Sequence, residues 1–285
     1  MSEALRFGLF RLGIGLVGLL PGALIRRLGE LGGRIWGRFA STRRQMARRH
    51  MERVLGPDAD LDRAVGAMFG SYGRYWAETF WVRPERVPEI DSRLSISGLE
   101  HLEKAGKAGT GAILVLPHVG NWEPAALSGR RAGIEIAAVA ERLPNRRITQ
   151  WFVKMRAQYG ITIIPHGRTS MRHVEEAIRR GAAVALLCDR DLSRRGVKVT
   201  FFGEETTLPA GPATLALKTG APVVTAATFF EGEGHRVDIN ELSLDGVDDV
   251  RGLTQRIATA LEAIIRQAPE QWHLFQPNWP SDHHS

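Results

Sequence analysis

Residues 113–123 read ILVLPHVGNWE, and this stretch decides the fold class. Its apolar run is typical of a buried strand. The run stops at Pro117, and His118 follows at once in a turn that opens a helix. We therefore expect a buried strand that presents a histidine at its carboxyl end.

A second apolar run ends in the same way at residues 184–191, which read VALLCDRD. Charged side chains are not normally placed at the end of a buried strand without a partner. In open α/β sheets, polar groups just beyond the carboxyl ends of strands line the ligand crevice. The two strand ends together indicate where the functional site lies.

His118 is the candidate general base of this site, because imidazole accepts a proton from a hydroxyl at cellular pH. Such a base needs a carboxylate that orients the ring and stabilises the imidazolium. Glu123 could reach back around the turn, and Asp189 or Asp191 could arrive from the neighbouring strand. The alternative is a structural histidine whose hydrogen bonds are satisfied within the core.

The rest of the chain alternates short apolar runs with helical periodicity. We expect strands over 112–116, 134–140, 161–165, 184–188, 197–202 and 222–229, and helices over 60–82, 147–159, 170–180, 211–219 and 250–267. This pattern predicts an α/β fold with a central, mostly parallel mixed sheet flanked by helices and preceded by a helical N-terminal segment.

Residues 1–56 hold eleven arginines against three acidic residues, whereas the whole chain has a net charge of only +7. Apolar residues interrupted by glycines accompany these arginines, over a run too short for the roughly 20 residues of a spanning helix. We expect residues 1–56 to lie on an anionic membrane and residues 57–285 to form the α/β domain. A core-packing helix, a secretory signal and a nucleic-acid surface are the alternatives.

The composition sets further limits. With 285 residues, 44% hydrophobic and 24% charged, the chain falls in the globular range, which excludes a disordered, collagen-like or polytopic membrane protein. Cys188 is the single cysteine, so no internal disulfide is possible. There is no Gly-x-Ser-x-Gly motif, and Cys188 falls within an apolar strand, so neither a serine nor a cysteine nucleophile is indicated.

Residues 118–123 resemble the His-x4-acid signature of glycerolipid-type acyltransferases. Within that group the chain is similar to the bacterial lipid A biosynthesis acyltransferase family and its branch of phosphatidylinositol mannoside acyltransferases. The resemblance extends over nearly the whole chain, because further motifs occur in the order that this branch shows: 71–76 (SYGRYW), 140–143 (AERL), 189–192 (DRDL), 201–204 (FFGE), 209–213 (PAGPA), 219–221 (TGA) and 272–273 (WH).

The resemblance implies transfer of a fatty acyl chain, palmitoyl above all, from acyl-CoA or an acyl carrier protein to a mannose hydroxyl of phosphatidylinositol mannoside. It implies direct attack assisted by a His-carboxylate dyad, with no covalent acyl-enzyme. His118 then is the base and Asp189, where close relatives often have glutamate, is the second dyad member. Because aspartate is shorter, Glu123 remains open as the orienting group. The implied location is peripheral, at the cytoplasmic face of the plasma membrane.

Several side chains are candidates for substrate binding. Acyl-CoA, as co-substrate, and the inositol phosphate bring anions that arginines bind well. Backbone N–H groups around Gly120 and Asn121, or the Arg156 side chain, could stabilise the oxyanion. The full set of expected substrate-binding residues is Arg142, Arg156, Asn121, Arg190, Arg195 and Lys218.

Two other functions are alternatives to acyl transfer. A metal-dependent hydrolase would take His118, Glu123, Asp189 and Asp191 as ligands. A nucleic-acid-binding protein would use the arginines between Arg26 and Arg53. Neither explains the ordered strand-end motifs, so we expect no cofactor, no metal and no nucleic-acid partner.

Overall fold

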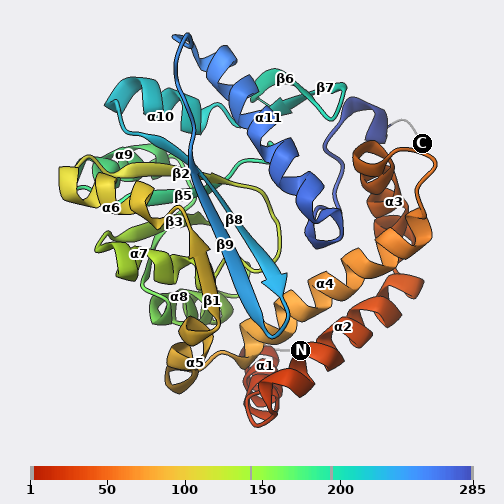
Figure 1. Cartoon of the computed structure of the whole chain (residues 1–285). Helices are drawn as coiled ribbons and strands as arrows, with labels where there is room; N and C mark the ends of the chain where they lie inside the picture. Colours follow the sequence, from red (N-terminus) through yellow and green to blue (C-terminus); the bar gives the residue numbers. More distant parts are fainter. Residues whose placement is uncertain (1–2, 142, 193–194, 284–285) are drawn as a thin grey trace.

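The computed structural model describes residues 3–141, 143–192 and 195–283. The chain begins with four helices, which lie together at the lower right of Figure 1: α1 (Glu3–Val17), α2 (Gly22–Phe39), α3 (Ser41–Leu55) and α4 (Leu61–Trp81). Helices α2 and α4 approach closely because glycines face one another, and a Cβ on Gly33 would lie 2.1 Å from the carbonyl oxygen of Phe69. Helix α2, which precedes the expected boundary at residue 56, therefore packs directly against α4, which follows it.

A seven-stranded sheet forms the centre of the molecule, with strand order β1-β9-β8-β2-β5-β3-β4. All neighbouring pairs are parallel except the β8–β9 hairpin, so the expected mostly parallel mixed sheet is confirmed. The strands are β1 (Leu94–Ser97), β2 (Ala112–Leu116), β3 (Ile136–Ala140), β4 (Ile161–Pro165), β5 (Ala183–Leu187), β8 (Val223–Glu231) and β9 (Gly234–Glu241).

Helices cover both faces of the sheet (Figure 1). Alternate residues of a strand point to opposite faces, and in β2 Ile113 belongs to one buried core and Leu114 to the other. The Ile113 core includes residues of α9 (Ser170–Arg179), α10 (Gly211–Thr219) and α11 (Val250–Gln267). The Leu114 core includes residues of α5 (Val87–Ser92), α6 (Leu99–Ala108), α7 (Leu127–Ala132) and α8 (Arg146–Gln158).

The structure departs from the expected elements in several places, and helices α5, α6 and α7 and strand β7 (Glu204–Leu208) were not expected. The strand expected over 197–202 is β6 (Val197–Phe201), but it pairs with β7 in a separate antiparallel hairpin outside the main sheet. Strands β1 and β9 were not expected, because their short or polar sequences, LSIS and GHRVDINE, lack an apolar run. Strand β9 is stabilised by backbone pairing with β8, and β1 pairs with β9 at the edge of the sheet.

Candidate active site

The two strand ends that carry the candidate residues lie side by side. Strands β2 and β5 are in register, with Leu116 opposite Leu187, and the Cys188 N–H continues the ladder by donating to the Leu116 carbonyl at 2.9 Å. The segments that follow both strands must therefore leave the sheet at the same point. His118 and Asp189 meet there.

Asp189 is the carboxylate that contacts the His118 ring. Its Oδ1 lies 2.6 Å from His118 Nδ1, and its Oδ2 accepts the His118 backbone N–H at 2.9 Å. Burial opposes the charge of Asp189, but His118 and Trp272 outweigh it and hold the pKa of this carboxyl below its usual value. Because an ionised carboxylate only accepts hydrogen bonds, Nδ1 carries a proton, and in the neutral ring Nε2 is the basic nitrogen.

A third donor to Asp189 comes from the C-terminal segment. The Trp272 indole N–H donates to Asp189 Oδ2 at 2.8 Å, and Asn278 Nδ2 donates to the Asp189 carbonyl at 3.0 Å. The His273 N–H also binds the His118 carbonyl at 2.7 Å. Sequence reasoning assigned no role to Trp272. The only signal for it was that 272–273 is one of the motifs in the resemblance.

The turn after His118 requires a glycine. Gly120 has a φ of +59°, and a Cβ there would lie 2.0 Å from the Thr228 carbonyl oxygen. Its N–H donates to the Gln271 carbonyl at 2.9 Å. This N–H, expected as an oxyanion donor, is therefore already used within the structure.

Glu123 lies on the same loop but contacts a different partner. Its buried carboxylate accepts two hydrogen bonds from Arg156 Nε, at 2.9 and 3.1 Å, and one from Nη2 at 2.9 Å. Burial disfavours the arginine's charge, but Glu123 outweighs this and raises the pKa of Arg156. Glu123 thus fixes α8 against the loop, and of the three carboxylates that the sequence left open Asp189 is the one that reaches the imidazole.

His118 lines a large cavity of about 1190 Å³ on the Leu114 side of the sheet. Alternate residues of the strands form the floor of the cavity, and α8 forms one wall. Ala138 and Ala185 of the floor have small side chains, which leave space between the sheet and α8. Its apolar lining includes Leu114, Leu116, Ala138, Ala185, Leu187 and Phe152. The imidazole therefore borders an apolar space larger than the roughly 300–1,000 Å³ common for small-molecule pockets.

The expected substrate-binding residues are not all at this cavity. Arg156, Arg190 and Arg195 line it, as do Arg146 and His166, which sequence reasoning did not select. Lys218 lies in an exposed ion pair with Glu175, at 2.7 Å, and does not line the cavity. Asn121 is buried against Glu78 and is also absent from the lining. Arg142 lies outside the described residues.

The four residues of the metal-site alternative do not converge. Asp191 accepts hydrogen bonds from the Gly196 N–H and the Thr207 hydroxyl, while His118 pairs with Asp189 and Glu123 with Arg156. Among residues 3–141, 143–192 and 195–283, no group of three His, Cys, Asp or Glu side chains has the arrangement of a metal site.

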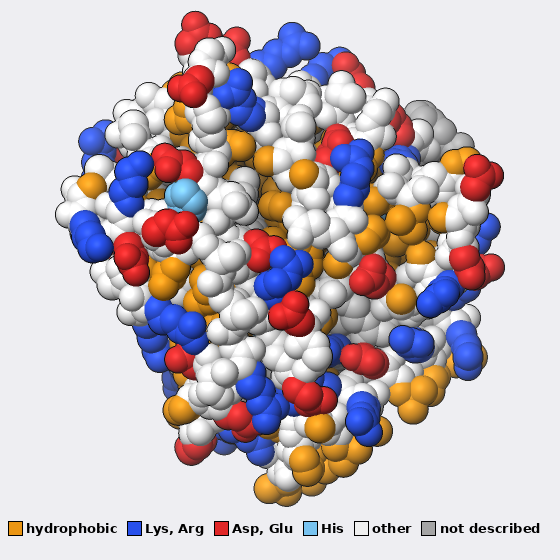
Figure 2. All heavy atoms as spheres, viewed as in Figure 1, with side chains coloured by type: hydrophobic (Ala, Val, Ile, Leu, Met, Phe, Trp, Pro, Cys, Tyr) orange, Lys and Arg blue, Asp and Glu red, His pale blue; other side chains and the backbone are white. Residues whose placement is uncertain are grey.

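The N-terminal helices expose an apolar surface. Figure 2 shows hydrophobic side chains gathered at the lower edge of the molecule, where Figure 1 places α1 and α2. Exposed apolar side chains recur at helical spacing, with arginines between them: Leu5, Leu9, Leu12, Leu16, Leu24, Leu28, Leu31, Ile35 and Phe39. In the described part of the chain, every helix is too short or too polar to span a membrane.

Comparison with known proteins identifies relatives over nearly the full length. The family model of the bacterial lipid A biosynthesis acyltransferases matches residues 3–281. The chain is 36% identical over 275 residues to a phosphatidylinositol mannoside acyltransferase of Mycobacterium tuberculosis, covering 92% of this chain and 85% of the relative. A protein of the same name from Mycolicibacterium smegmatis is 35% identical over 277 residues, covering 94% and 89%. The lipid A biosynthesis palmitoleoyltransferase of Escherichia coli is 25% identical over 279 residues, with the same coverage.

Proposed function

The chain belongs to the bacterial lipid A biosynthesis acyltransferase family, and on that premise we propose that it transfers a palmitoyl chain from an acyl thioester to a mannose hydroxyl of phosphatidylinositol mannoside. The acceptor is proposed from the names of the relatives at 35–36% identity. One observation of the structure carries the chemistry: the His118–Asp189 contact of 2.6 Å at the edge of an apolar cavity.

In the proposed reaction, His118 Nε2 takes the proton of the acceptor hydroxyl, and the hydroxyl oxygen attacks the carbonyl carbon of the thioester. The tetrahedral intermediate then expels the thiolate, which receives the proton from the imidazolium, so the ester and the free thiol are the products. Asp189 stabilises the positive charge that develops on the ring and holds it in the required tautomer. Cys188 is unsuited to a covalent step, because burial raises the pKa of its thiol.

The apolar cavity is the proposed site of the acyl chain. Removing the chain from water gains about 0.8 kcal/mol per CH₂ group, so the lining binds long chains well without polar contacts. The arginines that line the cavity, Arg156, Arg190 and Arg195, are the proposed contacts for the phosphates of CoA or of an acyl carrier protein.

We propose that α1 and α2 bind the cytoplasmic face of the plasma membrane as peripheral helices. Their exposed leucines would enter the lipid interface, and Arg27, Arg34 and Arg38 would meet anionic headgroups. This combination supports a lipid surface over nucleic acid, which offers no partner for a row of leucines.

The transfer reaction is tested by product mass. The protein is incubated with labelled palmitoyl-CoA in two separate reactions, one with phosphatidylinositol mannoside and one with a lipid A precursor as the acceptor. We expect one palmitoyl group on the mannoside and no product with the His118→Ala variant. Label found only as free palmitate, or transfer that survives His118→Ala, contradicts the proposal, and acylation of the lipid A precursor alone assigns the other acceptor.

Membrane binding is tested by sedimentation with vesicles that contain phosphatidylinositol. Replacing Leu9, Leu12 and Leu16 by serine should reduce the bound fraction severalfold, because exposed apolar area is removed while the charge stays the same. Leu55 and Leu217, exposed leucines outside α1, α2 and the cavity lining, provide the control when changed to serine. Equal binding of the α1 variant and the wild type would show that this face does not meet lipid.

A further inference from the structure

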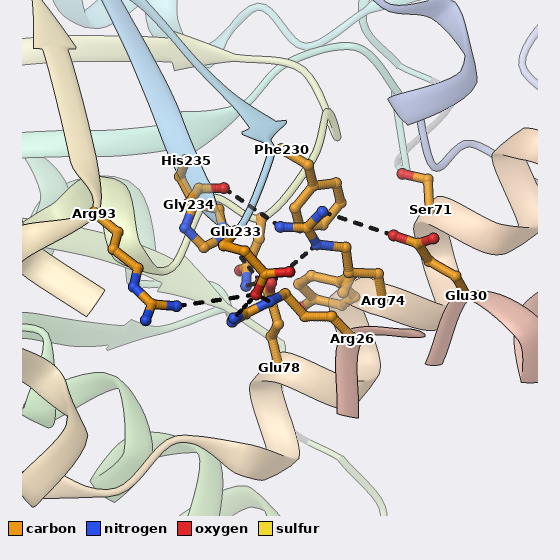
Figure 3. Close-up of polar contacts among 12 residues, drawn as sticks. Arg26, Glu30, Ser71, Arg74, Glu78, Arg93, Phe230, Glu233, Gly234 and His235 are labelled. Atoms are coloured by element: carbon orange, nitrogen blue, oxygen red, sulfur yellow. Dashed lines mark hydrogen bonds and ion pairs between the residues drawn. The ribbon is translucent and has the colours of Figure 1, made fainter. Parts of the chain in front are cut away.

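A buried cluster of charged residues lies where α4 packs against the β8–β9 hairpin (Figure 3). At its centre is Glu78 of α4, which is 6% exposed. Its Oε1 accepts from Arg74 Nε at 3.0 Å, and its Oε2 accepts from Asn121 Nδ2 at 3.0 Å and pairs with His235 Nε2 at 2.8 Å. Three elements distant in sequence therefore meet at one carboxylate.

The polar partners of Glu78 compensate for the cost of burying its negative charge. Burial disfavours an ionised Glu78, but His235, Arg74 and Asn121 outweigh it and hold the pKa of this carboxyl at about 2. Arg74 in turn lies 4.3 Å from the Phe230 ring and 3.7 Å from Glu30 of α2. Glu78 is held by Arg74 of α4 and His235 of the β8–β9 hairpin, and Arg74 in turn contacts α2. The Glu78 carboxylate therefore has a fixed position and can hold a further segment in place.

Asn121 connects the loop that carries His118 to Glu78. It lies in the loop between His118 and Glu123, and its amide nitrogen donates to Glu78 while its amide oxygen accepts the Glu123 N–H at 3.3 Å. The residue is 2% exposed and does not line the cavity, so it has no access to a substrate there. The residue that the sequence suggested for substrate binding therefore faces the interior.

We propose that Glu78 is a positioning residue that acts through Asn121 to fix the loop carrying His118 and Glu123. Asp189, the Gln271 carbonyl and Arg156 hold this loop at His118, Gly120 and Glu123, and the hydrogen bond from Asn121 to Glu78 connects it to α4. Without that hydrogen bond, the loop loses its link to α4 between His118 and Glu123, and His118 shifts relative to Asp189 and the bound thioester. A displacement of about 1 Å in a catalytic site can lower the rate about a hundredfold.

Asn121→Ala is the main test variant, because it removes the link without leaving a buried charge unpaired. The kinetic part of the test rests on the proposed acyl transfer. We expect kcat to fall tenfold to a hundredfold, with the KM for palmitoyl-CoA changed less than threefold. We also expect the proton NMR signal of His118 Nδ1–H, which reports its bond to Asp189, to shift or broaden; this signal needs no substrate.

Glu78→Gln and the double variant Glu78→Gln/Asn121→Ala test the route of the effect. If Glu78 acts through Asn121, the double variant has nearly the kcat of Glu78→Gln alone, since coupled residues give non-additive effects. The matched control is Glu233→Gln, which breaks the ion pairs with Arg26 and Arg93 in the same cluster but does not touch Asn121. We expect it to lower the melting temperature and leave kcat within twofold of wild type.

The outcomes separate this proposal from the proposed function. Wild-type kcat and an unchanged Nδ1–H signal in Asn121→Ala overturn the positioning role, even if the enzyme transfers palmitate as expected. If the wild type fails to acylate any lipid but the signal still shifts, the acyl-transfer assignment is wrong and the positioning role stands. Additive losses in the double variant, or an equal loss of kcat in Glu233→Gln, show a general effect of stability instead.

Discussion

Asp189 and Glu123 are two buried carboxylates in the segments that follow the neighbouring strands β5 and β2, and they differ in what they bind. Asp189 contacts an imidazole, whose charge changes when a proton is transferred. Glu123 contacts the guanidinium of Arg156, which stays charged at all accessible pH values. The His-x4-Glu motif thus spans two separate ion pairs, and only the one with Asp189 can take part in proton transfer.

Replacing each carboxylate by its amide gives the largest expected difference. In Asp189→Asn the side chain cannot stabilise an imidazolium and can donate to Nδ1, which favours the wrong tautomer, so kcat should fall by about 10⁴. In Glu123→Gln the loss should be mainly of stability, about 3 kcal/mol, because Arg156 keeps its charge with a weaker partner. Single-turnover transfer and urea unfolding measure the two effects. Equal kcat losses in both variants would refute the division of roles.

Removing the third donor to Asp189 should have a smaller effect on the same pair. Trp272→Phe keeps the buried ring but deletes the hydrogen bond to Oδ2. A hydrogen bond to a charged group contributes about 1.5–3 kcal/mol, and we expect kcat to fall at least tenfold. Trp279→Phe is the matched control, because its indole N–H donates to the Phe201 carbonyl, at 3.1 Å, and not to Asp189. A kcat within twofold of wild type in Trp272→Phe would show that two donors suffice to hold Asp189.

The elements that the sequence predicted well are those with a clear local pattern, which is a continuous apolar run for a strand and a helical periodicity of apolar residues for a helix. Strand β2 and helices α10 and α11 have the expected bounds, and α4 differs by one residue at each end. Strand β9 was missed because the predicted strands were those with continuous apolar runs, and its alternating sequence has none; it pairs with β8 in a hairpin.

Only the part of the site that lies directly at the ends of the strands could be predicted from the sequence. His118 and Asp189 each follow a buried strand, so their proximity could be expected from a parallel sheet. The partners of Glu123 and Asn121 lie in helices α8 and α4, and spacing along the chain carries no information about which helix packs behind a loop. Trp272 was missed as a donor for the same reason, since it arrives from a segment 83 residues beyond Asp189.

The wall behind Asp189 contains histidines that make this side of the site sensitive to acid. His50 of α3 lies between Trp272 and Trp279, with ring centroids 5.5 and 5.3 Å away, and its Nε2–H donates to the Gln276 carbonyl at 3.0 Å. Burial lowers the pKa of His50 from 6.5 to about 4. Burial and the nearby His118 likewise lower the pKa of His273 to about 3.

Because the pKa of His50 is lower in the folded state, the unfolded state binds more protons below pH 6.5. The stabilisation from neutral His50 is thus complete above pH 6.5 and is lost as the pH falls toward 4; by pH 5 the loss is about 2 kcal/mol. His50→Gln removes this titration but retains an amide donor for Gln276. Urea unfolding at pH 7.5 and pH 5 should show a decrease in stability that is about 2 kcal/mol smaller in the variant than in the wild type. The same decrease in both proteins would mean that the acid sensitivity arises elsewhere, with His273 as the next residue to change.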